Sequence, residues 1–287
     1  MSRSLLTRRV VETNRTLSIC IPTYNRPSMI LSLVTQTLAF RGNFELCVVN
    51  DGSSRPEYSE LSRIRDPRFR YRELPSNVGF GRALRAAFSM SRGTFVAQFN
   101  DDDTISEAGL TQILRDCEAG VGNGVAGFVY HMNDQQGELI GSEFPVDRAN
   151  LLELRADFGV RGDKKEVLLR TVLLEALGNE AVHSSRVIPP SLYWARCALT
   201  YDVLTRPHRV GTKIYLEDGL TKNIARTRID AIGALSTLAW VRVRGFRRSR
   251  YRSIRFLLRS LLQFLTYGTI FLLTTIIRPV SIRYRKS

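Results

Sequence analysis

The chain has 287 residues and a formal net charge of +15, from 42 Lys and Arg against 27 Asp and Glu. With 44% hydrophobic and 24% charged residues, its composition excludes an intrinsically disordered protein. The four cysteines (Cys20, Cys47, Cys117 and Cys197) are far apart in the sequence, which argues against structural zinc or a disulfide scaffold and fits a reducing compartment.

The excess positive charge is concentrated at the C-terminal end. Residues 242–287 contain 12 Arg and Lys and no acid, which leaves 30 basic and 27 acidic residues in 1–241, a net charge of +3. Most of the net positive charge therefore belongs to one terminal segment and is not a property of the whole protein. We therefore expect a basic lead over 1–15, a folded body over 16–240 and a separate tail over 241–287.

The first half of the chain alternates apolar runs with segments of helical periodicity. Strands are predicted over Leu17–Ile21, Phe44–Val49, Phe69–Leu74 and Thr94–Phe99, and helices over Ser28–Ala39, Gly79–Ser91 and from the N-cap Ser106 to about Cys117. Strands and helices that alternate at these intervals form βαβ units, so the fold class is α/β with a parallel sheet.

Polar loops follow each of the four predicted strands, at 22–26, 50–54, 75–79 and 100–103. In sheets of this kind ligands bind beside the carboxyl ends of the strands. One such loop is an ordinary turn in many proteins, but four on one edge predict a ligand site.

The last of these loops contains three consecutive aspartates, Asp101, Asp102 and Asp103. Adjacent carboxylates repel one another unless a cation or several donors offset their charge. Mg²⁺ and Mn²⁺ bind one or two carboxylates and complete their coordination with water and phosphate oxygens. A purely structural alternative is an acidic helix N-terminus, because Thr104–Glu107 leads into the next helix. The three aspartates lie among other loops of ligand-binding type, which favours a metal site.

The same four segments resemble family 2 glycosyltransferases of the GT-A fold. They read LSICIPTYNR (Leu17–Arg26), CVVNDGSS (Cys47–Ser54), NVGFGRALRAAFSMSRG (Asn77–Gly93) and FVAQFNDDD (Phe95–Asp103). The resemblance implies a nucleotide-diphospho-sugar transferase fold, with a mixed, mostly parallel sheet flanked by helices. It also implies an inverting enzyme that uses Mg²⁺ or Mn²⁺ to move a sugar from a nucleotide diphosphate, expected to be UDP, to a saccharide or lipid-linked acceptor.

The resemblance also implies roles for individual residues. The nucleotide pocket would be lined by Pro22, Tyr24, Asn25, Arg26, Asn77, Gly79 and Arg82, with Asp51 on the uracil or ribose. The aspartates correspond to a DxD-type motif, in which Asp101, Asp102 and Asp103 hold the metal and the diphosphate. Many members read L-D-x-D-D where this chain has Asn100 first, so the register stays open between Asn100/Asp102 and Asp101/Asp103. Residues 16–130 would form the nucleotide half and 131–240 the acceptor half.

The second half is less regular. A strand and a return strand are predicted within 124–140 around a turn at 133–137, and helices over Asp163–Gly178 and Ser191–Asp202. Three segments, Asp163–Val167, Ile188–Ala195 and Tyr215–Asn223, resemble a subgroup of these transferases linked to cell-surface glycan assembly.

An inverting transferase needs a general base for the acceptor hydroxyl. The subgroup has an acid just before the Trp194 helix, where this chain has Pro190. The candidate bases are Glu180 and His183 nearby, and Glu217 and Asp218 further along the chain. The replacement also leaves open a second hypothesis, a catalytically weak or inactive nucleotide-sugar-binding or scaffold protein of the same fold.

The tail combines arginines with an apolar run. Seven arginines lie between 242 and 255, and the 18 residues of Ser260–Ile277 carry no charge. A helix in the membrane interface, held by arginines to anionic lipid, is the favoured interpretation. It predicts a cytoplasmic protein, peripheral on the cytoplasmic face of the membrane. A buried helix or an oligomer contact is an alternative; nucleic-acid binding is disfavoured because no recognition motif accompanies the arginines.

Overall fold

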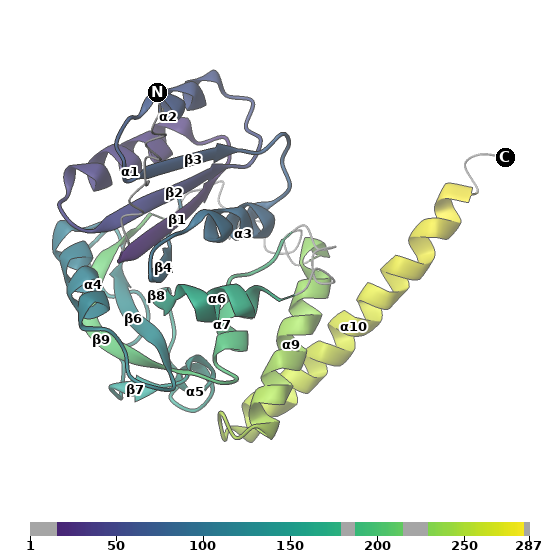
Figure 1. Ribbon diagram of the computed structural model, residues 1–287. Coiled ribbons are helices and arrows are strands. Elements are labelled where there is room, and N and C mark those ends of the chain that lie inside the picture. Colours follow the sequence, from purple (N-terminus) through teal and green to yellow (C-terminus); the bar gives the residue numbers. More distant parts are fainter. Residues whose placement is uncertain (1–15, 179–186, 215–228, 284–287) are drawn as a thin grey trace, which may run out of the picture.

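The computed structural model describes residues 16–178, 187–214 and 229–283, with side chains to residue 274. Its centre is a nine-stranded mixed sheet of order β3-β2-β1-β4-β8-β6-β9-β5, with β7 paired to β9 (Figure 1). The strands are β1 Leu17–Thr23, β2 Phe44–Asn50, β3 Phe69–Glu73, β4 Phe95–Gln98, β5 Asp103–Ile105, β6 Val125–Asn133, β7 Arg148–Ala149, β8 Lys164–Leu169 and β9 Asp202–Lys213. The helices are α1 Pro27–Ala39, η1 Pro56–Tyr58 (3₁₀), α2 Ser59–Arg63, α3 Phe80–Met90, α4 Glu107–Ala119, α5 Leu151–Ala156, α6 Arg170–Leu177, α7 Ser191–Cys197, α9 Ile232–Arg247 and α10 Ile254–Arg283.

The predicted βαβ half is confirmed, because β3, β2, β1 and β4 run parallel in that order. β1 and β2 are buried along their whole length, as expected for central parallel strands covered on both faces. Ser106 caps α4 as predicted, since its hydroxyl accepts a hydrogen bond from the Gly109 amide at 3.0 Å.

The helix predicted over Asp163–Gly178 is wrong in its first part. Lys164–Leu169 is strand β8, which pairs antiparallel with both β4 and β6, and the helix α6 begins only at Arg170. Lys165 and Val167 are buried on one face of the sheet, while Leu168 belongs to the hydrophobic core on the other face. This two-residue alternation and the pairing on both sides outweigh the helical propensity of Lys, Glu and Leu.

Two further boundaries differ from the predicted ones. The helix expected over Ser191–Asp202 ends at Cys197, and Asp202 begins the long strand β9. The return strand expected after the turn at 133–137 is reduced to one bridge between Asn133 and Leu139. In both places pairing with β6 decides the outcome, because β9 runs beside β6 over its length.

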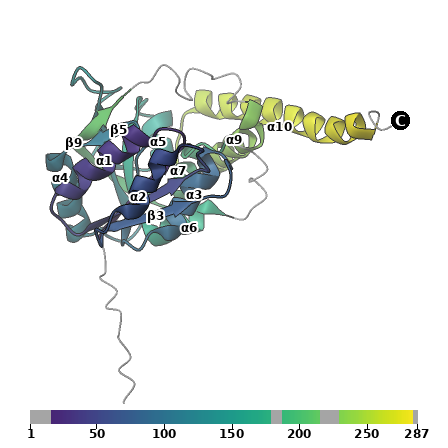
Figure 2. The same cartoon turned by 90° about the horizontal axis from the view of Figure 1, so that it is seen from above.

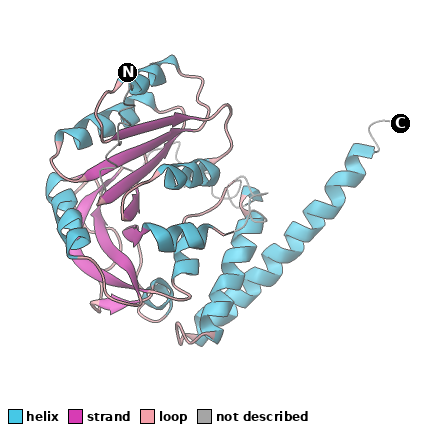
Figure 3. Cartoon of the chain, viewed as in Figure 1, coloured by secondary structure: helices cyan, strands magenta, loops and turns pink. Residues whose placement is uncertain are grey.

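Helices cover both faces of the sheet (Figure 3). One core joins the sheet to α1, α2 and α4, and the other joins it to α3, α6, α7 and α9. Successive residues of a strand point into different cores. In β1, Ile19 and Ile21 belong to the first core and Cys20 belongs to the second.

The C-terminal helices form a hairpin beside the sheet. α9 packs against α7, and α10 packs against α9 and extends away from the body (Figures 1 and 2). α9 continues across residue 240, where the body was expected to end. Within the described residues one helix is long and apolar enough to cross a membrane: Ile254–Thr274, with a mean hydropathy of 1.5 and 6% of the segment buried.

Candidate functional site

Three loops at the carboxyl ends of β1, β2 and β3 are bonded to one another and form a rim. The Asp51 amide donates to the Thr23 carbonyl at 2.9 Å. The Asp51 carboxylate accepts hydrogen bonds from the amides of Val78 at 2.8 Å and Gly79 at 2.9 Å, at the start of α3. Asp51 is therefore buried and joins the loop after β2 to the next helix, a structural role that the sequence prediction missed.

The close approach of these loops explains Gly52. Its φ is +66°, and a Cβ at this position would lie 2.3 Å from the Ser76 backbone carbon. Only glycine fits this conformation without moving the loop after β3. Asn25 also has a positive φ of 55°, and its amide donates to the Ser53 hydroxyl at 2.9 Å.

The remaining residues predicted for the nucleotide pocket lie on the same rim. Pro22 is buried in β1 opposite Val49, Tyr24 is 44% exposed, and Arg82 is exposed in the first turn of α3. Asn77 is half-buried and precedes that helix. Their common location is the edge at which ligands bind in α/β sheets.

The acidic segment follows β4, and the chain's own cations partly offset its charge. Arg26 Nη1 lies 3.1 Å from Asp101 Oδ1 and 3.3 Å from Asp102 Oδ2. The other Asp101 oxygen accepts from the Thr23 hydroxyl at 2.8 Å, and that hydroxyl also lies 2.8 Å from the Tyr58 hydroxyl. Burial raises the pKa of Asp101, while Arg26 and Thr23 oppose the rise. Arg26 is thus a partner of the aspartates as well as a rim residue.

Asp103 has a structural environment. Its side chain is fully buried, and its Oδ2 accepts from Lys165 Nζ at 2.5 Å and from the Asn100 amide at 2.9 Å. Lys165 also lies over the Phe99 ring, 4.5 Å from its centroid. This buried pair holds β8 to the acidic segment, and the helix predicted over Asp163–Gly178 did not anticipate it.

Asp102 is the aspartate that fits a metal. Its Oδ1 is buried and, like Asp103 Oδ1, has no hydrogen-bond partner in the part of the chain that the structure describes, but Asp103 is already neutralised by Lys165. Burial and the neighbouring Asp103 charge raise the pKa of Asp102, and the nearby cations Lys213 and Arg26 offset only part of this rise. Among the described residues no three acids, histidines or cysteines converge as a complete ligand set. A divalent cation here would be held by Asp102 together with diphosphate oxygens, an arrangement usual for Mg²⁺.

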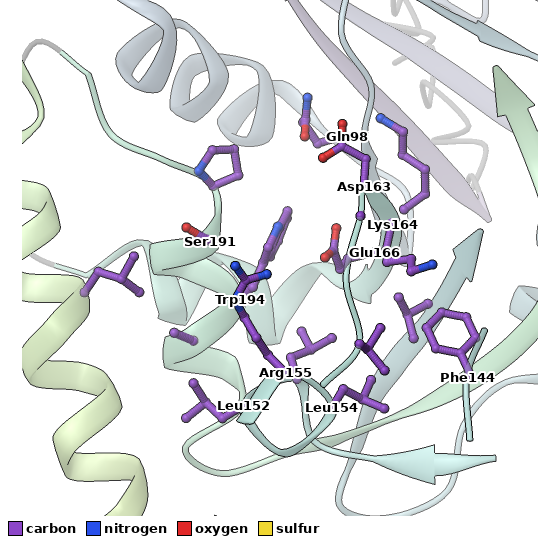
Figure 4. A pocket seen from close by; sticks show the side chains of 18 of the residues that line it. Gln98, Phe144, Leu152, Leu154, Arg155, Asp163, Lys164, Glu166, Ser191 and Trp194 are labelled. Atoms are coloured by element: carbon purple, nitrogen blue, oxygen red, sulfur yellow. The ribbon is translucent and has the colours of Figure 1, made fainter. Parts of the chain in front are cut away.

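A cavity of about 390 Å³ opens beside the acidic segment (Figure 4). Its walls come from the ends of β4 and β8 and from α5, α7 and α9. The polar and aromatic residues that line it are Gln98, Asn100, Arg155, Asp163, Lys164, Lys165, Glu166, Ser191, Trp194, Lys213 and Arg242. Gln98 Nε2 donates to Asn100 Oδ1 at 2.7 Å, so the residue that stands where many relatives have aspartate is fixed beside the cavity.

Glu166 is the functional candidate that the sequence prediction missed. Figure 4 shows its carboxylate pointing into the cavity, on the side that also holds Gln98 and Asp163. Burial raises its pKa from 4.5 to about 7, and a hydrogen bond from its own backbone amide and the charge of Lys165 oppose this rise. The wrongly predicted helix hid this residue, because only the strand assignment places Glu166 and Leu168 on one face.

The predicted general bases Glu180, His183, Glu217 and Asp218 lie outside the described residues. Pro190 is within them, and it occupies the N-cap of α7 in the cavity wall. Proline suits the start of a helix but has no group that accepts a proton.

Comparison with known proteins agrees with this architecture. The family model described as Glycosyl transferase family 2 matches residues 18–166, more than half of the chain. An N-acetylglucosaminyltransferase of Rhizobium meliloti (strain 1021) is 34% identical over 111 residues, which cover 36% of this chain and 26% of that protein. The succinoglycan biosynthesis protein ExoO of the same organism is 30% identical over 100 residues, covering 34% and 29%. The chain thus matches less than a third of the length of either relative.

Solved structures share the fold at low sequence identity. S. aureus TarS 1–349 in complex with UDP-GlcNAc has a TM-score of 0.58 and 17% identity, covering 88% of this chain and 81% of that one. The mannosyltransferase PcManGT from Pyrobaculum calidifontis, in complex with GDP-Man and Mn²⁺, has a TM-score of 0.57 and 16% identity, covering 90% and 74%. The GT-A architecture expected from the sequence is confirmed, and so is its apolar C-terminal helix. The chain belongs to glycosyltransferase family 2.

Proposed function

We propose that the chain transfers a sugar with inversion from a nucleoside diphosphate donor, UDP-linked, to a saccharide or lipid-linked acceptor. The observation that carries the proposal is the interlocked rim of three strand-end loops beside Asp102, whose Oδ1 has no partner among the described residues. Such a rim offers the nucleoside backbone and side-chain hydrogen-bonding groups around the exposed Tyr24 ring.

Asp102 would hold Mg²⁺ or Mn²⁺ against the diphosphate, and the metal would neutralise charge on the departing diphosphate. Arg26 already pairs with Asp101 and Asp102. When the diphosphate binds, the Arg26 guanidinium is well placed to contact its oxygens, because arginine forms planar, paired hydrogen bonds with phosphate. Asp51 would contact the base or ribose, because a carboxylate accepts hydrogen bonds from a base N–H or from ribose hydroxyls.

A thermal-unfolding screen tests the donor. Full-length protein is heated with UDP-, GDP-, TDP- and CMP-linked sugars, each with Mn²⁺ and with a chelator. We expect UDP-sugars with Mn²⁺ to raise Tm, because a ligand that binds the folded state stabilises it in proportion to its concentration over Kd. If no nucleotide sugar raises Tm under either condition, the proposed function is wrong.

Pro190 favours a second candidate, a nucleotide-sugar-binding protein with little or no turnover. It predicts the same Tm increase with donor but neither transfer nor hydrolysis of the donor. Measured release of UDP from a stabilising UDP-sugar would exclude it.

We further propose that α10 attaches the protein to a membrane surface. Leu258, Leu262, Leu265 and Leu272 are exposed by 60–66% along this helix, at spacings of four, three and seven residues that form a stripe. Arg252, Arg255 and Arg259 at its beginning are exposed and suit anionic headgroups. Co-sedimentation with phosphatidylglycerol vesicles should decrease when Leu258, Leu262 and Leu265 are changed to Ser. If the variant sediments as well as the unchanged protein, attachment does not use this stripe.

A further inference from the structure

An inverting transfer needs one group that accepts the proton of the acceptor hydroxyl, and this requirement rests on the proposed function. Pro190 stands in the cavity wall where the related subgroup has an acid. A base for this chain has to come from another element that faces the same space.

Strand β8 supplies a carboxylate to that space. Val129 of β6 pairs with Glu166, and Ala97 of β4 pairs with the following residue, Val167. Glu166 thus lies at the point where β4 ends and the acidic segment begins. Asn100, the first residue of that segment, and Pro190 line the same cavity as Glu166, so the carboxylate shares one cavity with both.

The Glu166 carboxylate is unusual because no other residue in the described part of the chain forms a hydrogen bond or an ion pair with it. Its own backbone amide is its one hydrogen-bond donor there, whereas Asp101 and Asp103 each have two donors from other residues. The charged groups that face the cavity around it are Arg155, Asp163, Lys164, Lys165, Lys213 and Arg242. Asp163 is paired with Lys213 at 2.8 Å, and Lys165 with Asp103, so these neighbours are engaged elsewhere. A half-buried carboxylate without a partner destabilises the folded chain unless a ligand uses it.

We propose that Glu166 is the general base of this transferase. Its carboxylate takes the proton from the acceptor hydroxyl while the hydroxyl oxygen forms a bond to the anomeric carbon of the donor. The bond from that carbon to the phosphate oxygen breaks, and its electron pair leaves with the nucleoside diphosphate. The pKa of about 7 suits this role near neutral pH, since a base works best when its pKa is close to the working pH.

The test uses Glu166→Gln, which keeps the size of the side chain and removes the proton acceptor. The probe reactions are hydrolysis of the stabilising UDP-sugar, with water as acceptor, and transfer to a panel of simple glycosides. We expect kcat to decrease roughly 10²- to 10⁴-fold and the Kd for UDP to stay unchanged. The limb of the pH–rate profile that rises near pH 7 should disappear.

Two control variants separate the alternatives. Asp163→Asn removes a neighbouring acid that is paired with Lys213, and it should retain the pH-dependent limb. Asp218→Asn removes a rival base. If Glu166→Gln retains full turnover while Asp218→Asn loses it, the proposal is wrong.

A second measurement needs no turnover. An infrared titration follows the C=O band of the protonated carboxyl group, and the difference between the unchanged protein and Glu166→Gln should titrate near pH 7. No band that titrates above pH 6 would contradict the proposal. Failure of the proposed function is a different result, because it would appear as a lack of donor binding with the Glu166 titration intact.

A separate observation concerns the cavity wall nearest the C-terminal hairpin. Burial together with Arg155 of α5 and Arg259 of α10 lowers the pKa of Arg242 of α9 to about 10. Burial, Arg161 and Arg259 likewise lower the pKa of Arg155. No carboxylate among the described residues pairs with Arg155, Arg242 or Arg259. Arg242 is held in place, because its Nη1 donates to Gln263 Oε1 at 3.2 Å and its guanidinium lies 5.5 Å from the Phe256 ring centroid.

From this cluster we infer that the acceptor carries an anionic group that binds between Arg155 and Arg242, both of which line the cavity. Guanidinium groups pair with phosphate and carboxylate through two parallel hydrogen bonds. The anion is a phosphate of a lipid-linked saccharide or an acidic group of the saccharide itself.

Binding of inorganic pyrophosphate, with UDP and Mn²⁺ saturating the donor site, tests this inference. Arg155→Gln and Arg242→Gln should each weaken it at least tenfold, while Arg247→Gln, an exposed arginine of α9, should leave it unchanged. Competition by farnesyl diphosphate and by a uronic-acid oligosaccharide then distinguishes the two sources. Equal pyrophosphate affinity in all variants, or competition by neither compound, would overturn the inference.

Discussion

The rim and the cavity are adjacent, but they differ in whether their charged side chains have partners. On the rim and in the adjoining acidic segment, Asp51, Asp101 and Asp103 each accept at least two hydrogen bonds, and Asp103 is paired with Lys165 at the edge of the cavity. In the cavity Glu166, Arg155 and Arg242 have no oppositely charged partner among the described residues. Partnered charges stabilise the fold, whereas unpartnered ones indicate where a substrate completes the interactions. Mutation of the two regions should therefore change stability in opposite directions.

The largest effect is expected at the buried pair of Asp103, in the acidic segment, and Lys165, in β8. Lys165→Met leaves the Asp103 carboxylate buried and unpaired, which should lower the free energy of unfolding by about 3–5 kcal/mol. Urea denaturation measures the loss. The double variant with Asp103→Asn should recover part of it, because no buried charge remains. A loss below about 1 kcal/mol in the single variant would show that the pair is not as buried as the structure indicates.

In the cavity the sign should reverse, with a dependence on pH. The pKa of Glu166 is higher in the folded chain, so its penalty on folding is absent below the unfolded pKa, grows from about pH 4.5 to 7 and is constant above. Glu166→Gln should match the unchanged protein at pH 4 and be more stable by up to about 3 kcal/mol at pH 8. Denaturant unfolding at both pH values measures this difference. If Glu166→Gln is less stable than the unchanged protein at pH 8, Glu166 stabilises the fold and the account of the cavity is wrong.

A smaller effect is expected at Tyr58, whose buried hydroxyl lies 2.8 Å from Thr23 Oγ1 and accepts from the Arg26 amide at 3.0 Å. Tyr58→Phe should lower the free energy of unfolding by about 1 kcal/mol, because one partner of each hydrogen bond is lost. It should also weaken UDP binding by loosening the loop that carries Arg26. Calorimetric titration with UDP checks the second effect. If the UDP affinity does not change, the stability of this loop does not affect donor binding, and the second expectation is wrong.

The sequence predicted the rim well because its features are local. Turn residues directly follow short apolar strands, so their positions at one sheet edge follow from the βαβ order alone. The Asp51 contacts with Val78 and Gly79 and the Asp103–Lys165 pair join residues 27 to 62 positions apart. No periodicity reveals such pairs.

The cavity was hidden for a related reason. The segment Lys164–Leu169 has helix-forming residues, and only its pairing with β4 and β6 makes it a strand. The arginine cluster joins three helices, α5, α9 and α10, whose arrangement depends on packing of the hairpin against α7. The apolar tail, by contrast, was visible from composition, since a long uncharged run needs no tertiary information.

The central claim is that the rim binds a nucleoside diphosphate through a metal held by Asp102. Calorimetric titration of UDP, with Mn²⁺ and with a chelator, tests it directly in the unchanged protein and in Asp102→Ala. The account predicts that Mn²⁺ increases UDP affinity at least tenfold in the unchanged protein, about 1.4 kcal/mol, and has no effect in the variant. An equal increase in both proteins, or none in either, would contradict it.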